Sequence, residues 1–195
     1  MNALNRKLIT GGLSKPSKMP GYAYNLPATE CKVGAKLVQV PGSVCHGCYA
    51  LKGRYRFPNV KEAMHRRLAS IQDPLWVETM AADINARKSK YFRWHDSGDI
   101  QSLAHLKKIF DVCKLTPDVA HWIPTRESGI LSKLGPEEVP ANLTIRLSAT
   151  MVDGNAPKNS WHLTSTVVTE GASCPAPKQG NECKSCRNCW DQSIK

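Results

Sequence analysis

The pattern of apolar and polar positions along the chain predicts amphipathic helices. In the stretches 60–72, 75–88 and 100–115, apolar residues recur three and four positions apart, so they share one face of a helix. Asp73-Pro74 separates the first two stretches and suits the start of the second helix, because proline is favoured at the first helical position. A further short helix is expected near 127–134.

Between these helices, short runs rich in β-branched and aromatic residues predict strands at 90–96, 118–125, 142–150 and 161–168. Strands that alternate with helices indicate parallel βαβ units, so the predicted fold class is α/β. Too few strands are visible for a closed eight-stranded barrel, which favours a partial (open) barrel or a small doubly wound sheet. One or two more strands are expected in the N-terminal part.

The chain has 195 residues, which predicts a single domain over 1–195. Its parts differ in composition. An N-terminal cysteine-rich segment spans 1–59, an α/β core spans 60–172, and a C-terminal cysteine-rich segment spans 173–195.

Polar residues stand at the ends of the predicted strands. Because the C-terminal ends of parallel strands meet at one edge of the sheet, we expect these residues to form one polar site. Arg126 would bind an anionic group there, and the others would orient substrate or move protons. The alternative is that residues such as Ser97, Asp99 and Thr125 are only helix caps. The predicted catalytic residues are His95, Asp96, Arg126 and Glu127.

The formal net charge is +11, which favours polyanionic partners such as a nucleotide or nucleic acid. The alternative is a solvated basic surface without a dedicated partner, since the charge is spread along the chain. Its densest patches are 15–18, 52–56 and 66–67. Aromatic residues expected to be exposed, and so able to stack on bases, are Tyr22, Tyr24 and Tyr55.

Neither a membrane-spanning apolar run nor a secretory signal is visible in the sequence, so we expect a cytoplasmic protein without a membrane partner. In a reducing compartment, eight cysteines indicate metal binding or catalysis rather than disulfides. Cys113 lies alone on the apolar face of a predicted helix, and we interpret it as a buried, inert thiol.

The other seven cysteines form two clusters along the chain. Cys174, Cys183, Cys186 and Cys189 include a C-x2-C-x2-C run, which is typical of iron–sulfur loops, although a four-cysteine zinc site uses the same ligands. Cys31, Cys45 and Cys48 provide three thiolates, which would leave one iron of a four-iron cluster open. A dithiol redox pair at Cys45 and Cys48 is the alternative, and His46 is interpreted as a loop residue beside the site.

Five motifs carry a family resemblance: "CHGCYA", "FRWHDSGDI", "HWIPTRES", "RLSAT" and "CPAPKQGNECKSCRNCW". In this order, over residues 12 to 190, they resemble a phage-encoded family of small iron–sulfur proteins, the mycobacteriophage gene-product-eighty-eight type. The resemblance implies a bacteriophage origin, the cytoplasm of a bacterial host, and iron rather than zinc.

That family in turn is similar to a shortened radical S-adenosylmethionine (SAM) enzyme. The similarity implies that Cys31, Cys45 and Cys48 hold a [4Fe-4S] cluster with an open iron. It also implies that Ser97, Gly98 and Asp99 bind the amino group of SAM, although they match the family motif incompletely. The C-terminal cysteines would resemble an auxiliary cluster.

The predicted function is therefore that of an iron–sulfur protein, with one or two clusters, that binds or acts on a nucleotide or nucleic acid. A radical-SAM-like activity is one possibility. The first alternative is a non-enzymatic iron–sulfur protein that binds nucleic acid or a host protein. The second is an interaction module stapled by zinc.

Overall fold

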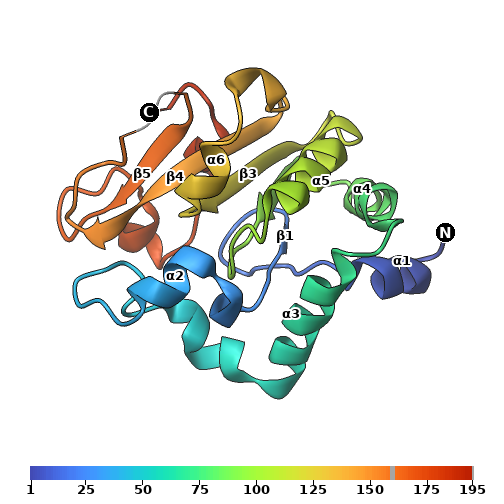
Figure 1. Cartoon of the computed structure of the whole chain (residues 1–195), viewed down its shortest axis with the longest axis horizontal. Helices are drawn as coiled ribbons and strands as arrows, with labels where there is room; N and C mark the ends of the chain where they lie inside the picture. Colours follow the sequence, from blue (N-terminus) through green and yellow to red (C-terminus); the bar gives the residue numbers. More distant parts are fainter. Residues whose placement is uncertain (159–160, 195) are drawn as a thin grey trace.

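The computed structural model describes residues 1–158 and 161–194, which form an α/β fold around an open, five-stranded parallel sheet (Figure 1). The strands lie in the sheet in the order of the chain. They are β1 (Tyr22–Tyr24), β2 (Tyr91–Trp94), β3 (Ala120–Thr125), β4 (Leu143–Val152) and β5 (Leu163–Val167).

The strand order excludes the doubly wound alternative within the described residues. A doubly wound sheet reverses direction at a switch point, whereas here every strand pairs with the next one along the chain. The predicted open parallel sheet is confirmed. β1 is the additional N-terminal strand that was expected, and it pairs with β2 from Tyr22↔Phe92 to Tyr24↔Trp94.

All predicted helices are present, and two further helices were not predicted. The first, α1, begins after Asn2, whose side chain accepts a hydrogen bond from the Asn5 amide, and ends at Gly11. The second, α2, is short and precedes the loop that carries Cys45 and Cys48, which we call the N-terminal cysteine loop. The helices are α1 (Ala3–Thr10), α2 (Lys32–Leu37), α3 (Pro58–Ser70), α4 (Trp76–Ala86), α5 (Leu103–Lys114) and α6 (Ser128–Leu131). The 3-10 helices are η1 (Ala28–Glu30), η2 (Tyr49–Leu51), η3 (Gly53–Arg56), η4 (Pro136–Glu138), η5 (Ala176–Gln179) and η6 (Asn188–Trp190).

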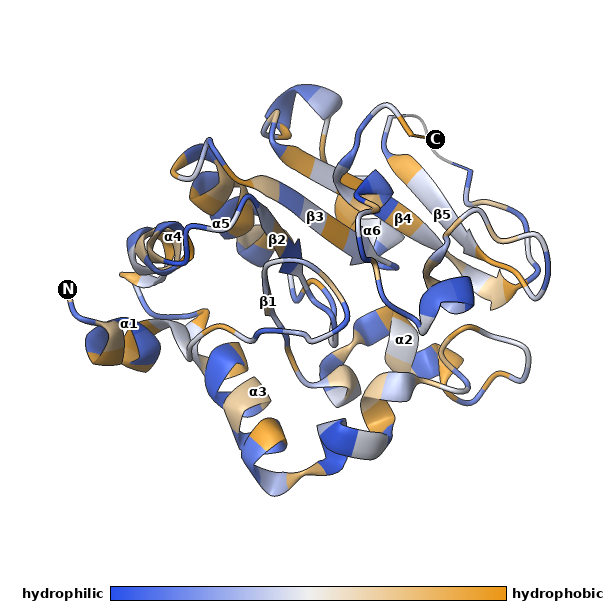
Figure 2. Cartoon of the chain, turned by 180° about the vertical axis from the view of Figure 1, so that it is seen from behind, coloured by the Kyte–Doolittle hydropathy of each residue, from blue (hydrophilic) through white to orange (hydrophobic). Residues whose placement is uncertain are grey.

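The main core lies between one face of the sheet and the helices α4 and α5. Phe92 and Trp94 alternate with Tyr91 and Arg93 along β2, so that only the first pair is buried in this core. The helices contribute Trp76 and other apolar residues to the same cluster. Figure 2 shows the apolar residues on β3, β4 and α5 that this packing requires. None of the described helices is both long and apolar enough to cross a membrane.

The opposite face of the sheet is covered by the C-terminal segment. Trp190 packs its ring against Tyr91 and Trp122, at 5.4 and 5.2 Å between ring centres. Its indole N–H donates to the Phe92 carbonyl over 2.9 Å, and its own carbonyl accepts from Thr144 Oγ1 over 2.9 Å. These contacts fasten the segment that carries the C-terminal cysteines onto the sheet. We call this side of the sheet the cysteine face; its residues include Tyr91, Arg93, Trp122, Thr144 and Arg146.

Candidate functional site

Cys31 and Cys45 approach each other at the start of α2. Cys31 is the residue directly before this helix. A Cβ built on Gly34 would lie 3.6 Å from the Cys31 sulfur and 3.5 Å from the Cys45 sulfur. Gly34 therefore leaves space that both thiols share, and a side chain at this position would crowd them.

The loop that carries Cys45 is attached to the end of β4. The Val44 amide donates to the Thr150 carbonyl over 2.9 Å. His46 Nδ1 lies 3.0 Å from the Val38 carbonyl oxygen, so the imidazole bonds to the backbone of its own loop. In Figure 1, α2 lies beyond the C-terminal ends of β3 and β4, which is the edge of the sheet where the sequence predicted a site.

Burial and neighbouring negative charge keep the thiols of Cys31 and Cys45 protonated in the metal-free chain. Burial raises the pKa of Cys31 to about 12, and Asp99 and Cys48 act in the same direction. Burial also raises the pKa of Cys45, while the Arg126 guanidinium opposes this shift. The charges of Cys31, Cys45 and Cys48 therefore act on one another, and the Arg126 guanidinium is the cation that acts on Cys45.

Glu127 holds the start of α2 in place. Its Oε1 atom accepts hydrogen bonds from the amides of Lys32 and Val33, over 3.1 and 3.0 Å. These amides have no acceptor within the helix, and Glu127 is buried, with only 4% of the residue exposed. Glu127, which was predicted to be catalytic, therefore positions the residue that precedes Lys32, namely Cys31.

Asp99 accepts three hydrogen bonds from its own chain. Its Oδ1 accepts from Thr125 Oγ1 over 2.6 Å and from the Ile100 amide over 2.8 Å, and its Oδ2 accepts from the Arg126 amide over 2.9 Å. Burial raises the pKa of Asp99 to about 6, although these hydrogen bonds favour the ionised form. Asp99 joins the end of β2 to the end of β3.

Ser97 and Gly98 fasten the same loop to the segment after β1. Ser97 Oγ donates to the Leu26 carbonyl over 2.5 Å. Gly98 has a φ of 76°, and a Cβ there would lie 2.6 Å from Leu26 Cβ, so only glycine fits. Ser97, Gly98 and Asp99, predicted to bind SAM, thus make structural contacts with the chain itself.

Asp96 forms a polar cluster with two tyrosines from the cysteine loop. Tyr49, which follows Cys48, donates to the Asp96 carbonyl, and Tyr55 Oη donates to Asp96 Oδ2 over 3.0 Å. Asp96 Oδ1 is buried and has no hydrogen-bond partner among the described residues. Burial raises the pKa of Asp96, and the Arg93 guanidinium opposes the shift.

His95 is not part of this cluster. Its φ of 58° turns the chain, and its ring enters the core beside His105 of α5, at 5.4 Å between ring centres. Its Nδ1 lies 3.2 Å from the Tyr24 carbonyl oxygen. Burial lowers the pKa of His95 to about 3, so the ring is neutral at physiological pH. Of the four predicted catalytic residues, Asp96, Arg126 and Glu127 lie near the N-terminal cysteines, whereas His95 lies in the core.

The C-terminal cysteines lie in the segment that packs on the cysteine face of the sheet. The Cys183 amide donates to the Lys18 carbonyl over 2.9 Å, and the Cys186 amide donates to the Cys183 carbonyl over 2.9 Å. Burial raises the pKa of Cys189 to about 11; Arg146 opposes the shift, and Cys174 and Cys183 reinforce it. These cysteines therefore influence one another as the N-terminal three do.

Arg146, which the sequence analysis missed, anchors this segment. Its Nη2 atom donates to the carbonyls of Asn188, Asp191 and Ile194 over 3.0, 2.9 and 2.9 Å. A charged residue in the middle of the apolar strand 142–150 was the available signal, because a buried arginine requires acceptors.

Arg93 is the second residue that was missed. It emerges from β2 on the cysteine face, with its guanidinium carbon 4.5 Å from the Trp122 ring centre. Its positive charge lowers the pKa of Asp96 on one side and opposes the raised pKa values of Cys183 and Cys189 on the other. Arg93 is thus a cation between the polar cluster at Tyr49 and the C-terminal cysteines.

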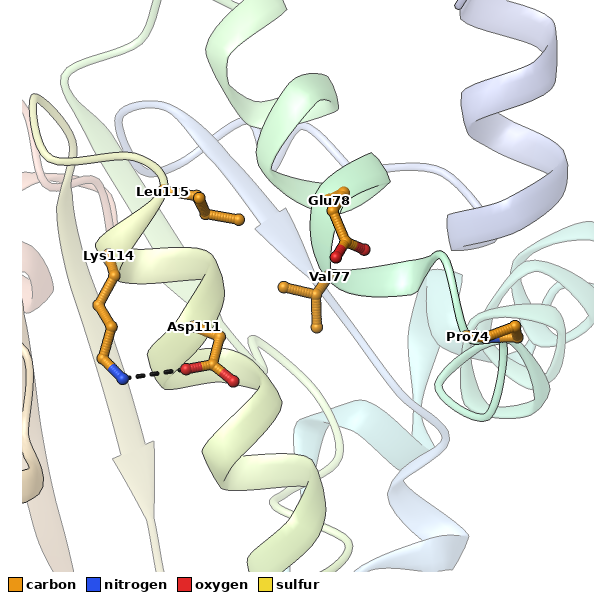
Figure 3. Close-up of a pocket in the computed structure, with 6 residues that line it drawn as sticks. All are labelled: Pro74, Val77, Glu78, Asp111, Lys114 and Leu115. Atoms are coloured by element: carbon orange, nitrogen blue, oxygen red, sulfur yellow. Dashed lines mark hydrogen bonds and ion pairs between the residues drawn. The ribbon is translucent and has the colours of Figure 1, made fainter.

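Two hollows in the described part of the chain bear on the search for a site. The first lies between α4 and α5, where Lys114 pairs with Asp111 over 3.0 Å, and it includes none of the cysteines (Figure 3). The second adjoins the N-terminal cysteine loop and includes Tyr55 and Met64. All eight cysteines are free thiols. No set of three or more His, Cys, Asp and Glu side chains in the described part of the chain is arranged to hold a metal ion.

The chain matches the family model for gene product 88 over residues 2–192. It belongs to the gene product 88 family. The match confirms the resemblance to this phage family that the five motifs indicated. Searches of curated proteins and of solved structures found no match.

In this member of the gene product 88 family, two features proposed for a nucleic-acid surface are buried instead. Tyr24 is 0% exposed, and its hydroxyl donates to the carbonyls of Thr10 and Arg67 over 2.7 and 2.8 Å. Arg67 is also buried, and its Nε donates to the Gly12 carbonyl over 2.6 Å. The expectation of an exposed Tyr24 was therefore wrong, and so was the expectation for Arg67, because both residues connect α3 to the N-terminal segment. Arg66, the other residue of the 66–67 patch, is partly exposed.

Proposed function

We propose that this protein is an iron–sulfur protein that binds or acts on a nucleotide or nucleic acid in the cytoplasm of a bacterial host. The observation that carries the proposal is the division of the cysteines. Three lie around the start of α2 and four lie in the C-terminal segment, while Cys113 is buried in the main core, away from either group in the sequence. The two groups are Cys31, Cys45 and Cys48, and Cys174, Cys183, Cys186 and Cys189.

The donor chemistry suits a metal centre. Burial raises the pKa of Cys31 and of Cys189 and so disfavours their thiolates, whereas a bound metal supplies a cation that displaces their protons. Thiolate ligands select zinc, copper(I) or iron–sulfur clusters. Each thiolate of a four-iron cluster binds a different iron, so the sulfurs stand further apart than around one ion. This requirement is compatible with the absence, among the described side chains, of a set that converges on a single ion.

When bound, a four-iron cluster would supply electron transfer, and three ligands would leave one iron for an exogenous group. The residues of the chain itself would organise the surroundings. Glu127 holds the start of α2 and hence Cys31, while Arg126 places a positive charge beside Cys45. SAM remains a prediction, and its amino group would have to compete for Asp99 with the three hydrogen bonds that this carboxylate accepts from the chain.

The test is to purify the chain anaerobically and to measure iron, sulfide and zinc per chain. We expect about eight irons and broad visible absorption. Serine at Cys31 and Cys45 should remove about half of the iron, and so should serine at Cys183 and Cys186. Cys113→Ala is the matched control and should retain all of it, because Cys113 is remote from both groups.

Zinc with little iron would replace the proposal with a structural zinc site. Paramagnetic resonance of the reduced protein, recorded with and without SAM, tests the radical-enzyme variant separately. A spectrum that SAM changes supports an open iron that binds this cofactor. An unchanged spectrum favours a redox or structural cluster in a protein that binds nucleic acid or a host protein.

A further inference from the structure

A second feature of the molecule, distinct from the cysteines, is a pocket of about 220 Å³ on the outer side of the N-terminal cysteine loop. Its walls come from the segment before Cys31, from the residues after Cys48 and from α3. The lining includes three basic side chains and three side chains that present apolar surface to the pocket. They are Arg56, Lys61 and His65, and Leu51, Tyr55 and Met64.

The pocket is connected to the end of β2. Tyr55 lines it and donates a hydrogen bond to Asp96 Oδ2 over 3.0 Å. Met64 also lines it, and its sulfur accepts from Ser97 Oγ over 3.3 Å. Ligands of open parallel sheets bind beyond the C-terminal ends of the strands, which is where these two contacts place the pocket.

The charges around the pocket have one sign. No aspartate or glutamate is among its lining residues. The nearest acidic residue along α3, Glu62, lies 3.6 Å from Arg66 and is thus partly neutralised. Arginine binds phosphate oxygens through two parallel hydrogen bonds, and lysine adds a point charge. Arg56 and Lys61 therefore form a wall suited to a phosphate group.

The opposite wall is suited to a base. Leu51, Met64 and the ring of Tyr55 present apolar surface, and aromatic rings stack on bases of any sequence. The volume lies below the range of about 300–1,000 Å³ that is typical of ligand pockets, which excludes a dinucleotide and leaves part of a mononucleotide outside the pocket. SAM fits poorly for a different reason, since its sulfonium and amino groups would face the positive charges of Arg56 and Lys61.

We propose that this pocket binds a mononucleotide, with its phosphate on Arg56 and Lys61 and its base against Leu51 and Tyr55. The inference deepens the proposed function by naming the nucleotide site, and it does not depend on which metal the cysteines hold. The ligand would contact both ends of the loop that carries Cys31, Cys45 and Cys48.

Calorimetric titration of the full-length, metal-loaded chain tests the proposal, with AMP, GMP, CMP and UMP as probes. At least one should bind about tenfold or more tightly than adenosine or inorganic phosphate alone, because each fragment uses only one wall. Arg56→Gln should weaken this binding about tenfold or more, since it removes a charged donor pair. Arg54→Gln is the matched control: Arg54 lies in the same 3-10 helix but outside the pocket, and its loss should leave binding unchanged.

Lys61→Gln provides a second variant on a different element, so the test survives if Arg56→Gln fails to fold. Equal weakening by Arg54→Gln and Arg56→Gln would overturn the proposal, because it would indicate general electrostatic attraction. Tighter binding of SAM, or binding of oligonucleotides without mononucleotides, would overturn it as well. Iron analysis of the same samples separates the two proposals: iron without mononucleotide binding refutes only the pocket, and mononucleotide binding without iron refutes only the clusters.

Discussion

Glu127 is expected to stabilise the fold and to place Cys31, and replacing it should affect both properties. Its carboxylate lies 95 residues along the chain from Lys32 and accepts hydrogen bonds from the amides of Lys32 and Val33. Glu127→Ala leaves both amides, whose hydrogen bonds are partly buried, without this acceptor. Glu127→Gln keeps an acceptor oxygen but removes the charge.

The magnitude follows from these contacts. A hydrogen bond to a charged group contributes about 1.5–3 kcal/mol, so two amides sharing one oxygen should cost about 3–4 kcal/mol when the acceptor is lost. The loss of charge alone at a helix start should cost about 1 kcal/mol. For a chain of this size, the alanine variant should melt about 10 °C lower and the glutamine variant about 3 °C lower.

The assay combines urea unfolding with iron analysis of each variant. Because α2 begins directly after Cys31, we expect the alanine variant to lose iron from the N-terminal group, and the glutamine variant to keep most of it. Glu30→Ala is the matched control. Glu30 is exposed, stands directly before Cys31, and contacts only Thr29 Oγ1 with its carboxylate, over 3.4 Å.

Two results would refute this reasoning. If Glu30→Ala destabilised the chain as much as Glu127→Ala, acidic charge near Cys31 would matter rather than the two hydrogen bonds. If Glu127→Ala unfolded at the same urea concentration as the unmodified chain, the amides of Lys32 and Val33 would not depend on this carboxylate.

Two further predictions concern Arg146, which anchors the C-terminal segment, and the buried His121. Arg146→Ala should increase the rate of proteolytic cleavage after residue 170 about tenfold or more, because three carbonyls lose a charged donor; Lys114→Ala, on the exposed side of α5, should not. His121 has a pKa lowered by burial to about 3, so the unfolded chain takes up a proton between about pH 6.5 and 3 that the folded chain does not, and stability falls as the pH falls. His121→Gln keeps a donor toward Thr116 Oγ1 and should reduce the slope of unfolding free energy against pH by about 1.4 kcal/mol per unit. The raised pKa of Asp99 gives a slope of the opposite sign, but Asp99 is present in both the unmodified chain and the His121→Gln variant, so its effect cancels in the comparison. If urea unfolding between pH 6 and 5 gave the same slope for both, the lowered pKa of His121 would be contradicted.

Much of the fold was predictable because its signals are local. The period of apolar residues identified α3, α4 and α5, and the short apolar runs identified β2 to β5. The helix α2 was missed because its six residues, "KVGAKL", are too few to show a period and contain a glycine. Part of its stability comes from Glu127, a contact that local sequence does not encode.

The predicted site was only partly accessible to sequence reasoning. The ends of parallel strands meet at one edge, and the hydrogen bonds of Asp99 to Thr125 and to the Arg126 amide join the ends of β2 and β3 there. Whether each side chain faces a ligand, the core or another segment depends on the turn that follows each strand. A positive φ at His95 takes its ring into the core, and three hydrogen bonds occupy the carboxylate of Asp99.

By itself, the sequence determined the strand and helix pattern, the number and spacing of the cysteines, the excess of positive charge and the family. These properties depend on residue identity and on separations of a few positions. Only the tertiary structure decided the strand order, the burial of Tyr24 and Arg67, the anchoring by Arg146 and the position of Arg93 between two groups of polar residues. The physical reason is that a charged or aromatic side chain is stabilised by whatever acceptors and rings surround it. In this protein, those partners come from segments far away in the chain.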